Sequence, residues 1–334
     1  MKKILVIRFS AMGDVVMTTP VLYSLVQQFT DVEITLLSRP QFESFFIDEN
    51  INFVGVDFKK HKGIWGLFKI FRKLRKQKFD AVADLHNVLR SRILCAFFAV
   101  CGIKIVKINK GRRDKKRLVS EKNKIFKQLP TSFERYANVF SRLGFDIKYQ
   151  SFESILNTQN AVNDKIKQIG IAPFAKHKGK MYPIEKTEQI VEYFSKTENV
   201  KIFLFGGGKN EAEILEKWEH KYNNVVSLAG KFNLCYEIIT IAGLDVMLAM
   251  DSANMHIASI VNTPVVSVWG ATHPFAGFYG WQQKPENAVQ IDLQCRPCSV
   301  FGDKECFRGD YACLNSITTE TIIEKIKLFL NNNS

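Results

Sequence analysis

The strongest constraint on the fold is the regular alternation of strand-like and helix-like segments along the whole chain. In the first half, short aliphatic and β-branched stretches separated by helical periodicity predict strands at 4–7, 33–38, 53–57, 81–85 and 104–108. The second half repeats the pattern, with strands predicted at 168–172, 201–205, 225–228, 245–250 and 264–269 and helices at 184–197, 209–221, 234–243 and 253–261. Strands that are apolar on both faces and alternate with helices are typical of parallel sheets. The sequence therefore predicts an α/β fold of two Rossmann-like, doubly wound parallel-sheet domains.

The length of 334 residues fits two domains of roughly 150 residues each. We expect a first domain over 1–157, closed by a helix at 132–143, and a second domain over 158–334. The polar stretch 157–164 is the expected hinge, and the last helix, 319–330, packs either on the second domain or back on the first. The default ligand site of such a pair is a central cleft that both domains face, at the carboxyl ends of their strands.

Composition excludes several other classes of protein. Hydrophobic residues make up 46% and charged residues 24% of the chain, which excludes an intrinsically disordered protein. No apolar run approaches the roughly 18 residues needed to span a bilayer. The apolar stretch from Ile4 to Ile7 is broken by Arg8 and is too short for a signal peptide. We therefore expect a cytoplasmic location, with peripheral contact to the inner face of the inner membrane as a further prediction.

Positive charge is concentrated in the first half of the sequence. Residues 1–155 hold 29 Lys and Arg against 14 Asp and Glu, whereas the remainder holds 18 against 19. Such a one-sided field attracts an anionic partner, and a nucleic acid, an anionic membrane surface and a phosphorylated lipid are the candidates. The most basic run, 107–127, has few apolar residues and is predicted to be an exposed, mobile loop.

The loop between the first strand and the next helix, residues 8–14, carries a carboxylate, Asp14, at the helix start. This loop has neither the glycine pattern of a dinucleotide-binding turn nor that of a Walker A loop. Asp14 is either a first-turn residue favoured by the helix dipole or a general base toward a hydroxyl in the cleft.

In the second half, polar motifs follow four predicted strands. The loop 172–183 contains Lys176 and Lys180, which suit a phosphate. The alternative is that this is simply a solvated loop. The glycine run 206–208 allows close approach of a ligand and precedes two acidic residues that suit a ribose, Glu211 and Glu213. The segment 251–256 opens a helix with the chemistry of a diphosphate site, and Thr272 lies in the last of these loops. Within that segment, Asp251 alternatively caps the helix, and His256 alternatively packs in the core.

Four of the seven cysteines are clustered near the C-terminus, at Cys295, Cys298, Cys306 and Cys313. In a cytosolic protein such a group favours a structural zinc site over disulfides. Only one CxxC pair is present, so free thiols remain the alternative.

Taken together, the motifs resemble those of the family 9 glycosyltransferases, the ADP-heptose:lipopolysaccharide heptosyltransferases. The matching features are the R-x-S-x-x-G-D opening with Thr18 to Pro20, the A-P-x-A and K-x-[WY]-P loop, the glycine-rich loop, the D-[ST]-[GA]-x-x-H-x-A segment and the x-G-x-T-x-P loop. They occur in the same order over nearly the full length, each at a strand end. Two residues depart from the usual pattern: Ala253 stands where many members have Gly, and Tyr182 stands where Trp is common. Because Ala disfavours positive φ, the turn after Asp251 is expected not to need it.

The resemblance implies a GT-B fold, with the acceptor on the first domain and the nucleotide-sugar on the second. It implies that Asp14 is the catalytic base and that Lys180 binds the donor phosphates. Asp251 would contact the transferred sugar, and the other residues expected at the donor are Lys176, Glu211 or Glu213, Ser252, Ala253, Asn254, His256 and Thr272. The residues expected at the acceptor are Arg8, Ser10, Met12, Gly13, Arg112 and Arg113.

The predicted function is inverting transfer of heptose, or a related sugar, from an ADP-sugar to a hydroxyl of a phosphorylated lipopolysaccharide core acceptor. No D-x-D signature is present, so no metal cofactor is expected in catalysis. The helix at 64–75 either rests on an anionic membrane or simply covers the sheet with a basic outer face. A nucleotide-sugar epimerase or hydrolase on the same fold is one alternative function. A nucleic-acid-binding protein is the other, although the basic half contains no recognisable module for it, so no nucleic acid partner is expected.

Overall fold

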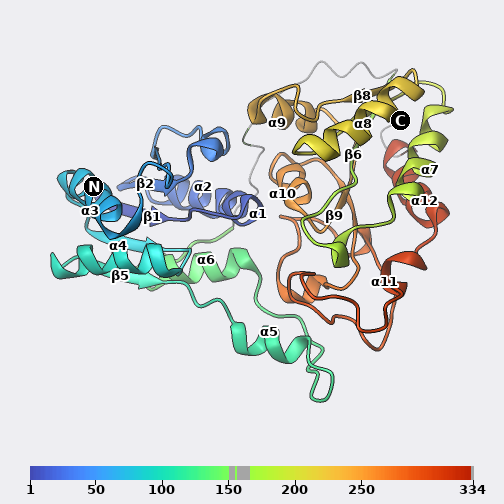
Figure 1. Cartoon of the computed structure of the whole chain (residues 1–334). Helices are drawn as coiled ribbons and strands as arrows, with labels where there is room; N and C mark the ends of the chain where they lie inside the picture. The colour runs from blue at the N-terminus through green and yellow to red at the C-terminus, as the bar shows by residue number, and fades with distance from the viewer. Residues whose placement is uncertain (150–154, 156–165, 332–334) are drawn as a thin grey trace. The chain divides into compact units, whose positions relative to one another are not determined.

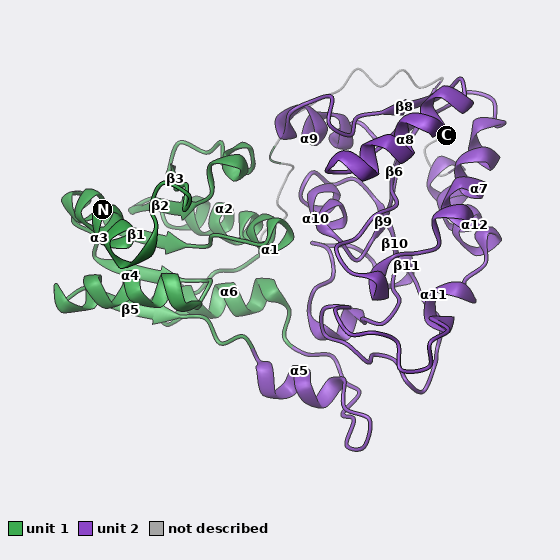
Figure 2. Ribbon diagram, viewed as in Figure 1, with its two compact units in different colours: residues 1–110, 130–155 green, residues 111–129, 156–334 purple. Residues whose placement is uncertain are grey.

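The computed structural model describes residues 1–149, 155 and 166–331, so the predicted hinge at 157–164 lies outside the described residues. The chain forms two compact units (Figure 2). Unit 1 comprises Met1–Lys110 and Pro130–Ile155, and unit 2 comprises Gly111–Leu129 and Leu156–Ser334. The segment 111–129, which the sequence prediction assigned to the first domain, is therefore grouped with the second unit.

Unit 1 contains a sheet of five parallel strands in the order β3-β2-β1-β4-β5 (Figure 1). The strands are β1 (Lys2–Ile7), β2 (Val32–Ser38), β3 (Ile51–Gly55), β4 (Ala81–Asp84) and β5 (Lys104–Lys107). Ile4 of β1 pairs with Ile34 on one side and with Ala81 on the other. β1 is flanked by strands on both edges, and its aliphatic side chains are buried on both faces of the sheet, as its sequence predicts.

The helices of unit 1 are α1 (Met12–Val16), α2 (Thr19–Gln28), α3 (Gly63–Leu74), α4 (Leu89–Val100) and α6 (Ser132–Ser141). Short 3₁₀ turns lie at Pro40–Phe45 and Arg75–Gln77. The start of α6 is fixed by a capping box, since Thr131 Oγ1 accepts the Glu134 amide and Glu134 Oε2 accepts the Thr131 amide. Helix α3 buries Leu67, Ile70 and Phe71 against the sheet and leaves a basic outer face. The helix therefore covers the sheet with a basic outer face, as predicted, and that outer face stays open to solvent.

Unit 2 contains six parallel strands in the order β11-β10-β9-β6-β7-β8. They are β6 (Lys167–Ala172), β7 (Val200–Leu204), β8 (Val225–Ser227), β9 (Val246–Met250), β10 (Val265–Val268) and β11 (Ala288–Val289). The helices are α5 (Arg112–Leu118), α7 (Ile184–Ser195), α8 (Lys209–Lys221), α9 (Leu234–Ala242), α10 (Ala253–Ile260), α11 (Ala312–Asn315) and α12 (Thr319–Asn331). Helix α12 buries Ile322, Ile326 and Leu330 in the core of unit 2 and contacts α7, β9 and β10.

Each sheet has a point at which the strand order reverses. In unit 1 it lies between β1 and β4, and in unit 2 it lies between β6 and β9. At such a point, consecutive connections leave on opposite faces of the sheet and open a crevice outside the carboxyl ends of the strands, where ligands of doubly wound folds bind. The loops that follow β1, β6 and β9 are therefore the positions to examine for function.

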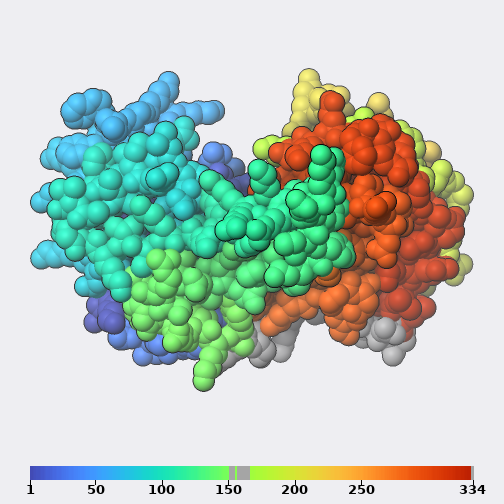
Figure 3. All heavy atoms as spheres, turned by 90° about the horizontal axis from the view of Figure 1, so that it is seen from below, coloured from blue at the N-terminus to red at the C-terminus, as the bar shows by residue number. Residues whose placement is uncertain are grey.

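The basic segment 111–129 is mostly exposed, as predicted for 107–127, but it is not an irregular loop, since part of it forms α5 and the segment is anchored on unit 2. The Leu129 amide donates to the Phe275 carbonyl at 2.9 Å, and the Phe126 ring contacts the His273 ring at a centroid distance of 4.9 Å. Leu118 and Leu129 form a small apolar cluster with Ala276. Figure 3 shows this green segment lying against the orange part of the chain that follows β10.

This anchoring also divides the positive charge between the units. The segment 111–129 carries eight Lys and Arg and two Asp and Glu. Unit 1 therefore holds 21 basic and 12 acidic residues, and unit 2 holds 26 and 21. The excess of positive charge is larger on unit 1, but unit 2 carries an excess as well. The linear sequence had suggested that the excess was confined to the first domain. Within the described part of the chain, no helix is both long enough and apolar enough to cross a membrane.

Candidate active site

In unit 1, the loop after β1 brings Asp14 against Arg8. An Asp14 carboxylate oxygen lies 2.5 Å from Arg8 Nη2, and the Asp14 side chain is 32% exposed. Arg8 itself is buried: its Nη1 donates to the Leu85 carbonyl at 2.6 Å, and its guanidinium lies over the Tyr136 ring. The Tyr136 hydroxyl in turn donates to the Asp14 carbonyl at 3.1 Å. The buried Arg8 guanidinium thus holds the Asp14 carboxylate on its inner side. About a third of the Asp14 side chain remains accessible to solvent and to a substrate.

Two polar residues that the sequence analysis missed, Asp84 at the end of β4 and His86 just after it, lie beside this loop. The fully buried Asp84 accepts the amides of His86 and Asn87 and the Ser91 hydroxyl, so its carboxylate is occupied in holding the start of α4. Burial, followed by the nearby Arg8 charge, lowers the pKa of His86 to about 3. His86 Nδ1 accepts the Phe9 amide at 3.4 Å, as a neutral imidazole does. Asp84 and His86 therefore support the Asp14 loop rather than offering a second acid or base.

The residues predicted to contact an acceptor are not brought together in one unit. Ser10, Met12 and Gly13 lie beside Asp14 in unit 1, and each is partly exposed. Arg112 and Arg113 lie on the exposed face of α5, which belongs to unit 2. A short run of charged residues does not indicate which unit a connecting segment packs on, so this separation could not be predicted from the sequence.

In unit 2, three predicted residues meet at the switch point between β6 and β9. Lys180 Nζ lies 2.9 Å from Asp251 Oδ2, and the same oxygen accepts the Thr272 hydroxyl at 2.8 Å. The side chain of Asp251 is 3% exposed and that of Lys180 is 16% exposed. These residues follow β6, β9 and β10, so three neighbouring parallel strands deliver them to the same edge of the sheet. We call this set the Lys180–Asp251–Thr272 cluster.

The cluster stands beside the first turn of α10, whose amides lack partners within the helix. Ser252 is the N-cap residue, but its side chain makes no capping bond, and its buried hydroxyl has no hydrogen-bond partner among the described residues. Ala253 begins the helix, so the turn needs no positive φ there, as expected. Asn254 is partly exposed, and His256 is buried within α10. Free helix amides and an unused hydroxyl are the chemistry that holds an anion.

The structure separates the two acidic residues that follow the glycine run. Glu211 folds back onto the loop, where its Oε2 accepts the Gly207 amide at 2.7 Å. Glu213 is exposed and lies 3.9 Å from Lys209 on the outside of α8. Glu211 is therefore the one at the strand end, which the sequence register left open. Lys176, also predicted at the donor, is exposed on the loop after β6.

The four clustered cysteines lie in one loop, residues 295–313, and all four line the same small cavity. They are free thiols. No group of three or more His, Cys, Asp or Glu side chains in the described ranges is arranged to hold a metal ion. The same loop carries a buried arginine, Arg296, that the sequence analysis did not single out.

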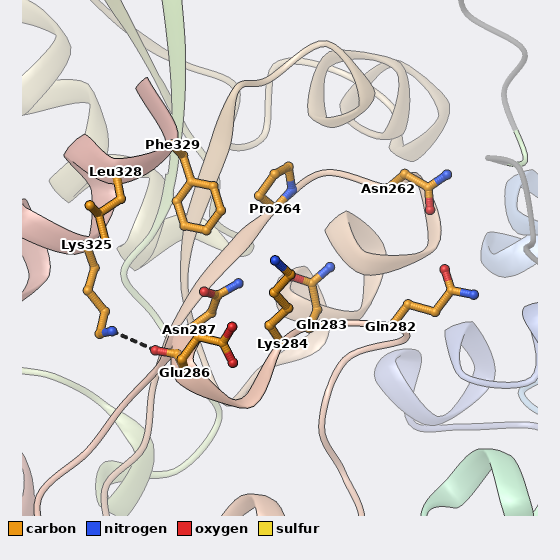
Figure 4. Close-up of a pocket in the computed structure, with 10 residues that line it drawn as sticks. All are labelled: Asn262, Pro264, Gln282, Gln283, Lys284, Glu286, Asn287, Lys325, Leu328 and Phe329. Carbon is orange, nitrogen blue, oxygen red and sulfur yellow. Dashed lines mark hydrogen bonds between the residues drawn. The ribbon is translucent and has the colours of Figure 1, made fainter. Parts of the chain in front are cut away.

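Unit 2 also contains two larger cavities. One, of about 320 Å³, is lined by amide side chains and by Lys325, which donates to the Glu286 carbonyl (Figure 4). It includes Pro264, which immediately precedes β10, so it opens at the amino end of that strand and away from the Lys180–Asp251–Thr272 cluster. The other, of about 360 Å³, lies between the 177–178 and 302–311 loops.

Comparison with known proteins agrees with the motifs. The model of glycosyltransferase family 9 (heptosyltransferase) matches residues 67–306, more than half of the chain. A lipooligosaccharide heptosyltransferase 2 from Campylobacter jejuni serotype O:2 is 24% identical over 335 residues, which cover 96% of this chain and 96% of that protein.

Solved structures show the same architecture. A glycosyl transferase family 9 protein from Veillonella parvula superposes with a TM-score of 0.77 at 20% identity, covering 99% of this chain and 98% of that one. The ADP-heptose lps heptosyltransferase II of E. coli superposes with a TM-score of 0.71 at 17% identity, covering 99% of both chains. Together with the two parallel sheets, these matches confirm the predicted GT-B fold. The chain belongs to glycosyltransferase family 9, the heptosyltransferase family, and is a glycosyltransferase.

Proposed function

We propose that this glycosyltransferase moves heptose, or a related sugar, from an ADP-sugar to a hydroxyl of a phosphorylated lipopolysaccharide inner-core acceptor. Its similarity to a lipooligosaccharide heptosyltransferase and to an ADP-heptose lps heptosyltransferase supports the sugar, the nucleotide and the acceptor class. The single observation that carries the proposal is the Lys180–Asp251–Thr272 cluster beside the first turn of α10, at the switch point of the unit 2 sheet. A cation, free helix amides and a strand-end carboxylate are what a sugar diphosphate requires.

In the proposed donor site, Lys180 and the amides at the start of α10 bind the diphosphate, and Asp251 contacts the sugar hydroxyls. Glu211 uses its second carboxylate oxygen for the ribose, since Oε2 is engaged with the Gly207 amide. As the sugar leaves, negative charge builds up on the diphosphate, and fixed positive groups stabilise it most when they are already oriented. Protein groups therefore replace the metal ion in this proposal.

In the proposed acceptor site, Asp14 takes the proton from the attacking hydroxyl. The new bond forms between that oxygen and the anomeric carbon, the bond from the anomeric carbon to the diphosphate oxygen breaks, and the electron pair leaves with ADP. Attack opposite the leaving group inverts the anomeric configuration. The ion pair with Arg8 keeps the Asp14 carboxylate oriented, and a carboxylate is the form of the side chain that accepts a proton.

The test is a transfer assay with ADP-heptose and a heptose-free inner-core acceptor, with the anomeric configuration of the product read by NMR. We expect transfer with inversion that persists in EDTA, and no consumption of donor when the acceptor is omitted. Consumption without acceptor would identify a hydrolase or an epimerase instead. Loss of transfer in EDTA from a protein that stays folded would contradict the metal-independent mechanism.

The outer surface of α3 supports peripheral binding to an anionic membrane, which we propose as part of the same function. No acidic residue occurs in α3, and its exposed positions include Lys69, Arg72 and Lys73. At its start, the Trp65 side chain is 75% exposed. The apolar stripe of the helix is buried in unit 1, so the attraction would be electrostatic, with Trp65 entering the interface.

Charge reversal of Lys69, Arg72 and Lys73 to Glu is expected to abolish co-flotation with vesicles that contain anionic phospholipid. The substitutions lie on the exposed face, so the melting temperature should change little. Neutral phosphatidylcholine vesicles are the control and should bind neither protein. Equal flotation of both proteins with anionic vesicles would exclude this face as the membrane contact.

We also propose that Cys295, Cys298, Cys306 and Cys313 bind a structural zinc ion. Their convergence on one cavity supports the proposal, although the thiols must close in to reach tetrahedral zinc distances. Metal analysis of protein produced with zinc should find about one zinc ion per chain. Cys298→Ser should lose it, whereas Cys235→Ser, at an exposed position outside the loop, should keep it. A zinc-free protein whose four thiols all react with a thiol reagent would exclude the site.

A further inference from the structure

The cysteine-bearing loop, residues 295–313, holds the strand-end segment that follows β10. Three successive carbonyls of that segment, 270–272, accept hydrogen bonds from the loop. Arg296 Nε donates to the first at 2.5 Å, and Arg296 Nη2 donates to the third at 3.0 Å. The amides of Cys298 and Ser299 both donate to the middle carbonyl, at 3.1 and 3.2 Å. The segment therefore has all three of its carbonyls fixed by one loop.

Arg296 is placed to act as a clamp. Only 5% of the residue is exposed, and its remaining donors reach the Gln290 side chain, at 3.0 Å, and the Ile291 carbonyl. A guanidinium is retained in an interior only where its N–H groups find acceptors, and the rigid fork of arginine supplies several in fixed directions. Lysine at this position would keep the charge but could not bridge all of these oxygens.

The clamped segment is directly connected to the Lys180–Asp251–Thr272 cluster. Thr272 supplies the hydroxyl that donates to Asp251 at 2.8 Å. The Ala271 amide donates to the Gly179 carbonyl at 2.8 Å, which ties the segment to the residue before Lys180. A shift of 270–272 would therefore displace both partners of the Asp251 carboxylate.

Gly302, in the same loop, supports the Lys180 side chain. A Cβ atom at Gly302 would lie 2.6 Å from Lys180 Cγ, 3.3 Å from Cδ and 3.5 Å from Cε. The lysine stem therefore runs across the surface of this glycine. Gly302 has φ +73°, so a larger residue would also be strained in its backbone. Because Cγ is in the middle of the stem, a side-chain movement that relieves the clash also moves the ammonium group from its position beside Asp251.

We propose that Arg296 and Gly302 are positioning residues of the donor site, and that the cysteine-bearing loop sets the geometry of Lys180 and Thr272 toward the donor diphosphate. The proposal rests on the proposed function in one respect, namely that the Lys180–Asp251–Thr272 cluster binds the diphosphate. It adds that a loop outside the motifs of the site controls how well that cluster is organised.

The chain offers a matched pair of variants for the test. Gly302→Ala places a methyl group against Lys180, whereas Gly309→Ala, in the same loop at φ +77°, meets nothing within 4 Å. Both variants strain the backbone to a similar extent, and only the first touches the lysine. ADP affinity, measured by titration calorimetry, should fall about tenfold in Gly302→Ala and less than about twofold in Gly309→Ala. The KM for the ADP-sugar should rise by a similar factor in Gly302→Ala.

Coupling to the lysine separates positioning from a general loss of loop structure. In a Lys180→Ala background the stem is gone, so adding Gly302→Ala should weaken ADP binding no more than adding Gly309→Ala does. Arg296→Lys, as a second probe, should weaken ADP binding with the acceptor KM unchanged. Melting temperatures of all variants identify any that fail to fold. If Arg296→Lys fails to fold, Gly302→Ala still tests the proposal.

The outcomes distinguish the inference from the function on which it rests. If the wild-type protein binds ADP and Lys180→Ala weakens that binding, but Gly302→Ala behaves like Gly309→Ala, the positioning role is overturned and the proposed function stands. If Gly302→Ala is equally harmful with and without Lys180, the loop does not act through the lysine and the inference is again overturned. If Lys180→Ala binds ADP as tightly as the wild-type protein, the donor-site assignment itself fails and the inference falls with it.

Discussion

Asp14→Asn is expected to lower kcat by about 10²–10⁴-fold while leaving ADP affinity within about twofold of the wild-type value. The amide occupies the same space as the carboxylate but cannot accept a proton at neutral pH. Asp14 is in unit 1, and the residues proposed to bind the donor are in unit 2, so a change in the base should not alter the diphosphate site. Steady-state kinetics with both substrates, together with titration calorimetry for ADP, separates the two effects.

The control for this prediction must account for Arg8, which loses its ionic partner in the variant. A buried guanidinium left without an opposing charge destabilises the fold, although here the Leu85 carbonyl remains as an acceptor. Melting temperatures should therefore accompany the kinetics. Asp57→Asn is a matched variant, since this partly exposed carboxylate accepts the Lys59 amide, a role that an Asn oxygen can keep. Turnover of Asp14→Asn within a few-fold of Asp57→Asn would remove Asp14 from the role of base.

The parallel strands could be predicted closely from the sequence, because burial on both faces leaves a local signature. The stretch predicted at 33–38 is observed as Val32–Ser38, and the one at 201–205 as Val200–Leu204. Helix ends were also readable where a strand stops and small residues follow. The helix predicted at 253–261 is observed as Ala253–Ile260, directly after Asp251 and Ser252. The sequence placed Lys180 and Asp251 after two different strands of one parallel sheet, and because the carboxyl ends of such strands share one edge, the two side chains lie together in the structure.

Tertiary packing of the long connections could not be predicted in this way. The segment 111–129 is mostly basic, and charge density indicates a solvated loop, but a few anchors decide where such a segment lies. Phe126 and Leu129 pack on the loop after β10, and Lys115 lies with its Nζ 3.8 Å from the centre of the Phe278 ring. Each of these contacts spans well over a hundred residues of sequence, so no local pattern reports it.

The supporting residues of the site were missed for the same reason. Arg296 stands between a cysteine and a proline and looks like any surface arginine in the sequence. Its burial and its hydrogen bonds to two carbonyls of another segment, those of Gly270 and Thr272, appear only in the fold. Gly302 looks like one turn glycine among several, and its importance comes from what passes over it. Motifs record the groups that meet a ligand, whereas the groups that hold them are defined by contacts across the fold.

Lys180→Met is the prediction with the second largest expected effect, and it tests the donor site directly. Met keeps an unbranched stem of similar length across Gly302 but removes the ammonium group that lies 2.9 Å from Asp251 Oδ2. Two losses then combine. The diphosphate loses the attraction of a cation. The buried Asp251 carboxylate keeps the Thr272 hydroxyl but no longer has the ammonium group beside it, so it repels the diphosphate. We expect ADP affinity to fall by about 10- to 100-fold, and kcat to fall as well because the leaving charge is less stabilised.

Lys178→Met is the matched control, since this exposed lysine lies two residues away in the same loop with its Nζ over the Tyr311 ring. The ADP affinity of this variant should stay within about twofold of the wild-type value, because the attraction between an exposed charge and the diphosphate is screened by water and salt. A second comparison identifies the repulsion from Asp251. Adding Asp251→Asn to Lys180→Met removes the unpaired buried carboxylate, so the double variant should melt at a higher temperature than Lys180→Met and should recover part of its ADP affinity. If Lys178→Met and Lys180→Met weaken ADP binding equally, the diphosphate is attracted by the loop's general charge and not by the Lys180–Asp251–Thr272 cluster.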